Sequence, residues 1–282
     1  DKFNILFLSK ETSFGREKFY YHDFDKDGTS EKIFLITDNY GMVGIIIRKD
    51  LGIINQWNFK GEWARLADPF IGDLSTDNNE EMFVFTVVNA SLYLHCIDPI
   101  ADKIVFEHKA VAKINKHNGL NDFEIFTGGL YDVDKDGFNE VFFTINTGYT
   151  IKPRNCFYYN YVLDSVFKSP ESCAPLFFPE FIDIDHDSVP EILFETYAYG
   201  NCAKERSYSD QYSWLMVYKP DLTFKFKPLK MNVFPSSLKV RQIGEKEKYL
   251  VALSQYDGAE QHESYLALIN KNGRIILFYL KI

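Results

Sequence analysis

Short apolar runs recur along the whole chain, and each ends at a cluster of Asp, Asn or Gly. In the first part of the chain they cover residues 32–37, 44–48 and 52–59. Short runs rich in Ile, Val, Phe and Tyr and bounded by turn residues are typical of strands in a β-meander. The one helical candidate is the stretch 61–66. The pattern therefore predicts an all-β protein.

One nine-residue pattern precedes an apolar run four times, and its copies begin 50, 59 and 51 residues apart. Oxygen-bearing side chains stand at positions 1, 3, 5 and 9, and a turn-forming residue stands at position 6. The clearest copy is 132–140, and the others are 23–31, 73–81 and 183–191. This period divides the chain into units of four strands, in which the acidic loop joins the first two.

The spacing of the acidic residues favours a metal site. Alternate carboxylates in a tight loop can turn inward onto one point, and Ca²⁺ accepts about six to eight oxygens from carboxylates, carbonyls and water. Gly at position 6 relieves the sharp turn, because Gly adopts positive φ freely. An EF-hand places its last acid at position 12 in a helical frame, whereas here position 9 leads into a β-prone run. The pattern predicts a calcium loop inside a β-hairpin.

We expect three loops to bind Ca²⁺ through side chains at positions 1, 3, 5 and 9 and the carbonyl at position 7. These ligands are Asp23, Asp25, Asp27, Thr29 and Glu31; Asp132, Asp134, Asp136, Phe138 and Glu140; and Asp183, Asp185, Asp187, Val189 and Glu191. In the remaining loop Ser75 replaces the acid and Asn78 replaces Gly, so a fourth site and a plain surface turn both stay open. Its candidate ligands are Asp73, Ser75, Asp77 and Glu81.

Asp-x-Asp-x-Asp-Gly-x-x-Glu before an apolar strand, repeated at about 50 residues, resembles the FG-GAP/VCBS β-propeller repeat. It is similar to the calcium loops of integrin α-chain propellers. The resemblance covers residues from about 17 to 200, and the Phe-Gly and Gly-Ala-Pro flanks are absent, so VCBS-like is the closer label. It implies four-stranded antiparallel blades with structural calcium. It says little about activity, because function belongs to sites rather than folds.

We predict a single β-propeller domain spanning residues 1–282, with calcium loops on one face only. Five blades are expected at about 17–60, 66–108, 123–168, 177–228 and 237–282. A strand at 3–9 is expected to pair with the last blade and close the ring, which would remove an exposed edge. The outer strands of the fourth blade are expected at 214–218 and 223–227.

Composition and charge narrow the choice of partner and location. Aromatic residues make up 17% of the chain, which suits sheets that pack face to face. The net charge of −9 disfavours nucleic acid and anionic membranes as partners. No apolar run reaches the length of a membrane span and no signal peptide is found, although the trimmed-looking start leaves a longer, membrane-anchored parent protein open. Because calcium is plentiful outside the cytoplasm, we expect an extracellular, periplasmic or cell-surface location.

The four cysteines lack a metal-binding spacing. Cys96 lies in a strand-like run and is expected to be a small core residue. If residues 157–168 form a hairpin that turns near 164–165, Cys156 and Cys173 lie opposite each other, and we predict a disulfide between them. Cys202, in a neighbouring loop, stays open as an alternative partner for either.

Long loops on the face opposite the acidic loops are rich in Tyr, Lys and Arg. Loops on a rigid scaffold often carry binding residues, so we expect a ligand site over the third and fourth blades. Tyr149, Arg154, Tyr199 and Arg206 are the predicted contacts, because Tyr and Arg often dominate binding energy. The alternative is that these are ordinary solvated loops.

Sequence signatures of common enzymes are absent, including Gly-x-Ser-x-Gly, His-Glu-x-x-His and phosphate loops. We therefore expect no catalytic residues and a non-enzymatic recognition module: a sensor, an adhesin, or a domain that binds a glycan or protein ligand. The alternative is a polysaccharide lyase or glycoside hydrolase acting on acidic glycan. There, Lys and Arg would neutralise a uronate and Glu195 would serve as acid or base.

Overall fold

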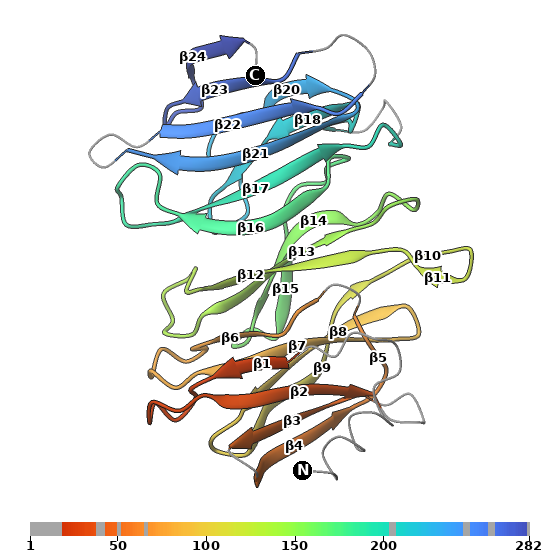
Figure 1. The fold of residues 1–282 in the computed structure, drawn as a ribbon, viewed down its shortest axis with the longest axis vertical. Coiled ribbons are helices and arrows are strands. Elements are labelled where there is room, and N and C mark those ends of the chain that lie inside the picture. The colour runs from red at the N-terminus through yellow and green to blue at the C-terminus, as the bar shows by residue number, and fades with distance from the viewer. Residues whose placement is uncertain are drawn as a thin grey trace. The chain divides into compact units, whose positions relative to one another are not determined.

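The computed structural model describes residues 19–37, 43–49, 52–64, 67–202, 207–244, 249–258 and 263–280. Within these ranges the protein is all-β, every strand pairing is antiparallel and no helix occurs, which confirms the predicted class. It follows that these residues contain no helix long and apolar enough to cross a membrane. The predicted strand at 3–9 lies outside the described residues. The chain divides into two compact units, Asp1–Lys113 (unit 1) and Ile114–Ile282 (unit 2), which are described separately (Figure 1).

The described residues of unit 1 form two antiparallel sheets. The strands of the first are β1 (Phe19–His22), β2 (Glu31–Thr37), β3 (Val43–Lys49) and β4 (Gly52–Phe59), paired in that order. The strands of the second are β5 (Glu62–Trp63), β6 (Phe70–Gly72), β7 (Glu81–Val88), β8 (Ser91–Asp98) and β9 (Lys103–Lys113). Both β5 and β6 pair with β7, which is followed by β8 and β9. The helical candidate at 61–66 is wrong where the chain is described, because Glu62 and Trp63 form a strand on the edge of β7.

Unit 2 begins with a small hairpin and a four-stranded sheet. The hairpin is β10 (Lys116–His117) and β11 (Leu120–Asn121), and the sheet is β12 (Glu124–Tyr131), β13 (Glu140–Asn146), β14 (Arg154–Asn160) and β15 (Ser165–Lys168). The remaining strands are β16 (Leu176–Ile182), β17 (Glu191–Ala198), β18 (Tyr212–Leu215), β19 (Val217–Tyr218), β20 (Leu229–Val233), β21 (Ser236–Ile243), β22 (Tyr249–Tyr256), β23 (Tyr265–Ile269) and β24 (Ile275–Leu280).

The fourth and fifth strand groups form one continuous sheet instead of two separate ones. Strands β16, β17, β21, β22, β23 and β24 pair in that order, and the short β19 pairs with β17 beside β21. The join arises at Thr196, whose hydroxyl accepts from the Trp214 N–H at 3.0 Å and donates to the Trp214 carbonyl at 2.8 Å. This side chain takes the place of a backbone pairing, so the end of β17 is left to pair with β21.

The outer strands predicted for the fourth group are therefore correct only in part. Tyr218 pairs with Phe224, as the predicted strands 214–218 and 223–227 require. In contrast, Trp214 and Leu215 lie in β18, which pairs with β20. The predicted outer pair breaks at this point because β18 leaves β17 for a different partner.

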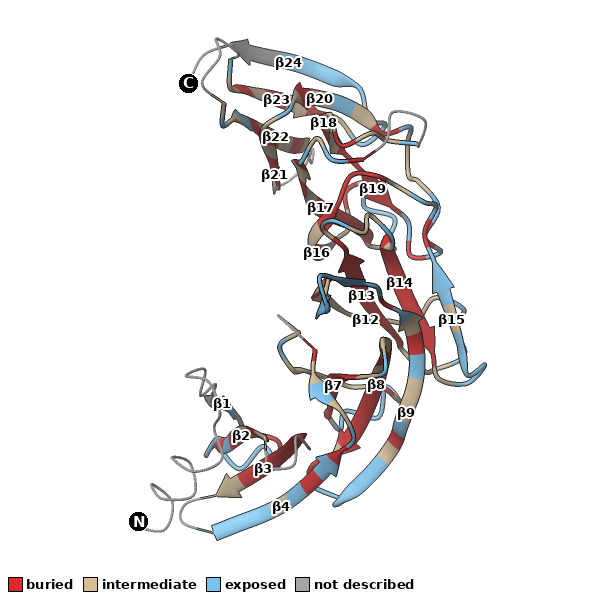
Figure 2. Ribbon diagram, turned by 90° about the vertical axis from the view of Figure 1, so that its right-hand side faces the viewer, coloured by how far each residue is buried: buried red, intermediate tan, exposed pale blue. Residues whose placement is uncertain are grey.

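The core lies on the middle strands of each sheet. All residues of β13 and β14 are buried, whereas the fourth strands β4 and β15 are mostly exposed. Figure 2 shows the same contrast between buried β7, β8, β13 and β14 and the paler fourth strands. Strands buried on both faces are expected to be continuous apolar runs, and the sequence Val141-Phe142-Phe143 is one.

Candidate metal centres

Each acidic loop joins the first two strands within the bounds of its predicted blade, as expected. The Asp23 loop (23–31) follows β1, the Asp73 loop (73–81) follows β6, the Asp132 loop (132–140) follows β12, and the Asp183 loop (183–191) follows β16. In every case the Glu at position 9 is the first residue of the next strand. The hairpin therefore fixes this Glu against the sheet and leaves the preceding acids on the turn.

The same three hydrogen bonds hold all four loops. The N–H of position 2 donates to Oε2 of the position 9 Glu at 2.9, 2.8, 2.6 and 3.0 Å in chain order. The N–H of position 6 donates to Oδ2 of the position 1 Asp at 2.8, 2.7, 3.1 and 3.2 Å. The N–H of position 7 donates to Oδ1 of the position 5 Asp at 2.9, 2.9, 2.8 and 2.8 Å. Positions 1, 5 and 9 are thus set in place by the backbone of their own loop.

Positive φ occurs at two positions in each loop, and sequence reasoning recognised only one of them. Position 6 has φ of 90° at Gly28 and 91° at Gly137, and Ser188 adopts 68° there despite its side chain. Position 4 also has positive φ in all four loops, at Lys26, Thr76, Lys135 and His186. The residue types at position 4 gave no signal for this conformation.

Three of the four loops bring carboxylates close enough to share one metal ion. The groups are Asp23, Asp25 and Asp27; Asp132, Asp134 and Asp136; and Asp183, Asp185 and Glu191, with ligand oxygens within 4.8 Å of one another in each. The Asp73 loop does not form such a group among the described residues, and Ser75 explains the loss of one carboxylate there. Glu31, Glu140 and Asp187 are not members of these groups, and they stay predicted ligands together with the carbonyls of Thr29, Phe138 and Val189.

The donor set fits a hard cation, because every group is made of carboxylate oxygens. Buried oxygens without a hydrogen-bond partner support the fit in two loops: Oε1 of Glu31 and Oδ1 of Asp185. Glu31 is fully buried, so this oxygen has lost its water as well. An unsatisfied buried acceptor is costly, and a cation is one group that would satisfy it.

Burial also raises the pKa of the Glu at position 9 in two loops. Burial raises the pKa of Glu140 to about 7, and the carboxylates of Asp134 and Asp132 reinforce the shift. Burial likewise raises the pKa of Glu81 to about 7, with Asp73, Asp77 and Asp98 adding to it. Close packing of acids without a positive charge therefore destabilises their ionised forms.

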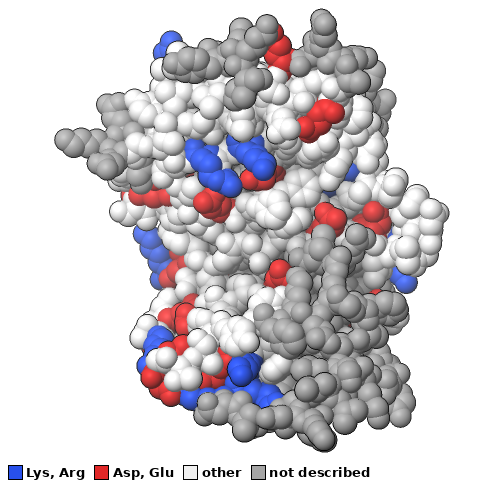
Figure 3. Space-filling view, in the orientation of Figure 1, with Lys and Arg blue, Asp and Glu red and all other residues white. Residues whose placement is uncertain are grey.

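Lysines enter the other two clusters. The Lys49 Nζ lies 2.7 Å from Oδ2 of Asp25, contacts Asp27 as well, and lies 3.4 Å from Oε1 of Glu31. Hydrogen bonds to Asp25 and Asp27 raise the pKa of Lys49, and the bond from Lys49 lowers the pKa of Asp27. Figure 3 shows basic and acidic side chains interleaved at the edge of unit 1 where β1 and β2 are joined.

The Asp183 cluster has the same arrangement with a different lysine. The Lys225 Nζ lies 2.6 Å from Oδ2 of Asp185 and 2.6 Å from Oε1 of Glu191. Burial acts to lower the pKa of Lys225, but the hydrogen bonds to Asp185 and Glu191 raise it. In the Asp132 cluster the corresponding group is neutral: Asn160 Nδ2 lies 3.1 Å from Oδ2 of Asp134 and 2.7 Å from Oε1 of Glu140.

Of the four predicted ligand contacts, two are exposed aromatic residues in unit 2. Tyr149 is 73% exposed and stacks on His117 with ring centroids 4.4 Å apart. Tyr199 is 39% exposed and contacts Phe177 and Tyr197. Arg206 lies outside the described residues.

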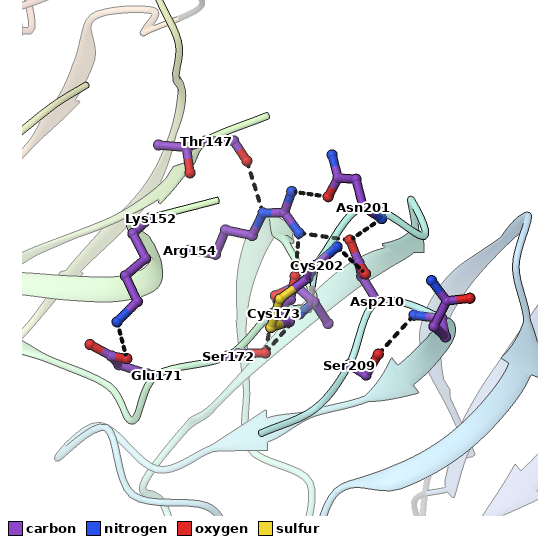
Figure 4. Close-up of a disulfide and its surroundings, with 12 residues drawn as sticks. Thr147, Lys152, Arg154, Glu171, Ser172, Cys173, Asn201, Cys202, Ser209 and Asp210 are labelled. Atoms are coloured by element: carbon purple, nitrogen blue, oxygen red, sulfur yellow. Dashed lines mark hydrogen bonds and ion pairs between the residues drawn. A yellow bond between two sulfur atoms is a disulfide. The ribbon is translucent and has the colours of Figure 1, made fainter. Parts of the chain in front are cut away.

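Arg154 is not a surface residue, so its predicted role as a ligand contact is wrong. Only 1% of Arg154 is exposed, and all five guanidinium N–H groups are used. They donate to the carbonyls of Thr147, Gly148 and Cys173 and to the side chains of Asn201 and Asp210 (Figure 4). Its partner Asp210 is fully buried and also accepts from the N–H groups of Asn201 and Cys202. Arg154 and Asp210 tie two loops together.

The predicted disulfide is also wrong. Cys173 is bonded to Cys202, with Cα atoms 5.8 Å apart, whereas Cys156 is a free buried thiol. The hairpin register is the reason: Phe157 pairs with Lys168, which places Ser169 rather than Cys173 opposite Cys156. Cys96 is buried in the core of unit 1, as predicted.

Glu195, the acid considered for an enzyme, lies on β17 and contacts the Arg241 guanidinium at 3.4 Å. Lys152, one of the basic loop residues, pairs with Glu171 at 2.6 Å. Both contacts are ordinary surface ion pairs of the kind that contribute little to stability.

The fold and the loops together define an all-β antiparallel protein with a recurrent acidic hairpin that could hold metal ions in three places. No family model and no curated protein matches the chain. Among solved structures, it is similar to the V. cholerae biofilm matrix protein Bap1, at 14% sequence identity and a TM-score of 0.44. The match covers 93% of this chain and 38% of that one, so the chain spans well under half the length of Bap1.

Proposed function

We propose that this protein is a calcium-stabilised recognition module that acts outside the cytoplasm, built as a VCBS-like β-propeller and without catalytic activity. The observation that carries the proposal is the grouping of carboxylate oxygens within 4.8 Å of one another in three of the loops, on a hydrogen-bond frame that all four loops share. A frame that fixes three acids before any cation binds reduces the ordering cost of binding. The Asp23, Asp132 and Asp183 loops would hold the ions.

Calcium is the cation that this donor set favours. Carboxylates on a flexible loop suit the variable geometry of Ca²⁺, whereas Mg²⁺ demands a near-ideal octahedron and keeps several waters. Where the unfolded chain has no site, the free energy of binding adds to the free energy of unfolding. Calcium binding would therefore raise the free energy of unfolding of the hairpins.

The disulfide supports a location outside the cytoplasm. Disulfides form and persist in oxidising compartments and are rare where thiols are kept reduced. The Cys173–Cys202 bridge joins two loops of unit 2, and both cysteines bond to the buried pair: Arg154 donates to the Cys173 carbonyl and the Cys202 N–H donates to Asp210.

The surface that supports recognition is a platform of two stacked rings, His117 and Tyr149, beside the apolar side chain of Leu120. Leu120 and Tyr149 are 76% and 73% exposed. Asp122 holds the platform by accepting from the N–H groups of Gly148 and Thr150 at 3.2 and 2.6 Å. Burial acts to raise the pKa of Asp122, but hydrogen bonds, that from Thr150 first, lower it, so the carboxylate is ionised. An exposed ring on a rigid loop suits stacking against a sugar ring or an apolar side chain.

A glycan and protein-ligand screen in calcium and in chelator tests this proposal. We expect chelator to lower the melting temperature by many degrees, and Asp134→Ala to weaken calcium stabilisation more than Ser75→Ala in the loop without a cluster. An identical melting curve in calcium and in chelator would contradict the metal assignment.

For the platform, we expect Tyr149→Ala to weaken binding about tenfold or more while the melting temperature stays within about 2 °C. Tyr21→Ala is the matched control, because Tyr21 is also exposed but lies on β1 of unit 1. Equal binding by Tyr149→Ala and the wild type would exclude the platform.

A further inference from the structure

Two of the three acidic clusters contain a positive charge supplied by the chain itself. Lys49 and Lys225 come from different parts of their sheets, yet each ammonium contacts the acids at positions 3 and 9 of its loop. Lys49 lies one residue beyond the Lys32–Arg48 pair, at the end of β3. Lys225 reaches its cluster from the segment that pairs with β19, where its N–H donates to the Val217 carbonyl. The same arrangement thus arises by two routes.

Neither lysine provides a hydrogen-bond donor for every buried carboxylate oxygen of its cluster. An ammonium group has three donors, whereas a calcium ion accepts about six to eight oxygens. In the Asp23 cluster, Oε1 of the fully buried Glu31 lies 3.4 Å from Lys49 and has no hydrogen-bond partner. In the Asp183 cluster, Oδ1 of Asp185 is likewise buried without a partner. Each cluster therefore retains an acceptor that a cation of higher charge and coordination would use.

The Asp132 cluster differs because its third-strand residue carries no charge. Asn160 occupies the place one residue beyond the Val141–Tyr159 pair, which corresponds to the place of Lys49 in the first sheet. Its amide contacts the acids at positions 3 and 9, as the lysines do, but does not neutralise them. A divalent cation that enters this cluster displaces no ion pair.

We propose that Lys49 and Lys225 are tethered internal cations that occupy the Asp23 and Asp183 clusters and compete with Ca²⁺, so that the Asp132 cluster binds Ca²⁺ most tightly. This inference rests on the proposed calcium function. It divides the three loops into two affinity classes. The Asp132 loop has no competing charge, whereas the Asp23 and Asp183 loops each have one. The lysines also hold their loops together when calcium is scarce.

Calorimetric titration with CaCl₂ tests the proposal on the full chain. Lys49→Met is compared with Lys26→Met, which also removes one positive charge. Lys26 lies in the Asp23 loop itself, but its ammonium donates to the Asn78 carbonyl outside the cluster. We expect Lys49→Met, but not Lys26→Met, to tighten one class of weak sites about tenfold or more. Lys225→Met should do the same relative to Lys227→Met, an exposed lysine nearby. Asp134→Ala should abolish the tightest class.

Melting in chelator gives a second readout. We expect Lys49→Met to melt below Lys26→Met without calcium, because its three acids then lack a counter-charge, and to recover when calcium is added. Calcium binding that is identical in Lys49→Met and Lys26→Met, or a tightest class that survives Asp134→Ala, would overturn this inference alone. The absence of calcium binding in the wild type and in Lys49→Met would overturn the proposed function together with it.

Discussion

Replacing Arg154 by Met removes a buried charge while leaving a side chain of similar length. Asp210 would then remain fully buried without its cationic partner, and the carbonyls of Thr147, Gly148 and Cys173 would lose their donors. Breaking a buried ion pair by removing one partner costs about 3–5 kcal/mol. For a domain of about 150–250 residues, 1 kcal/mol corresponds to roughly 2–4 °C in melting temperature. We therefore expect Arg154→Met to lower the melting temperature of unit 2 by roughly 6–20 °C.

Lys152→Met is the matched control, since it removes a positive charge two residues away. Lys152 and Glu171 form an ion pair whose side chains are 48% and 59% exposed. Exposed pairs contribute about 0–1 kcal/mol, so this variant should melt within a few degrees of the wild type. The double variant Arg154→Met, Asp210→Asn should recover part of the loss, because it no longer buries an unpaired charge.

Thermal unfolding followed by circular dichroism, in calcium-containing buffer, measures these differences. Arg154→Met and Lys152→Met that melt at the same temperature would refute the reasoning. That outcome would mean that the Arg154 network contributes no more than a surface pair.

Two further predictions concern the cysteines and a buried histidine. Peptide mapping without reductant should recover Cys173 joined to Cys202, and Cys202→Ser should cost about 3–4 kcal/mol, because the bridge closes a 29-residue separation; a cost under about 1 kcal/mol would contradict this. Burial, reinforced by His108, lowers the pKa of His95 to about 3. The neutral His95 ring accepts from the backbone N–H of His108 and donates to the Thr86 hydroxyl. Because the unfolded chain gains this proton below about pH 6.5 and the folded chain does not, stability should fall from pH 6.5 towards 3, and the slope should flatten in His95→Gln; equal slopes would contradict it.

The sequence predicted best what is determined locally. The strand expected at 52–59 forms with those bounds, and the acidic loops stand between the first two strands of each group. Apolar period and turn chemistry act within a few residues, so they could be recognised without knowledge of the rest of the fold.

Long-range partners could not be predicted in the same way. The four-residue turn 161–164 shifts the hairpin register, so Cys156 meets Ser169 and Cys173 is left for Cys202. The burial of Arg154 could not be recognised from the sequence around it, because its partner Asp210 lies 56 positions away. Lys49 is an intermediate case: once β2 and β3 are aligned, it falls next to the acidic loop, so the strand register carries a signal that the loop motif alone lacks.

The Asp73 loop shows that the motif encodes a turn conformation and a metal site separately. It lacks the acid at position 3 and the Gly at position 6, yet it keeps the three shared hydrogen bonds and the positive φ at positions 4 and 6. The frame therefore depends on the acids at positions 1, 5 and 9, which bond to the loop backbone, and not on the acid at position 3. A sequence that matches the motif consequently predicts the turn before it predicts the metal. The metal prediction needs an acid at position 3 as well, and the tighter class of site needs in addition an uncharged residue on the neighbouring strand, as at Asn160. The Asp132 loop satisfies both.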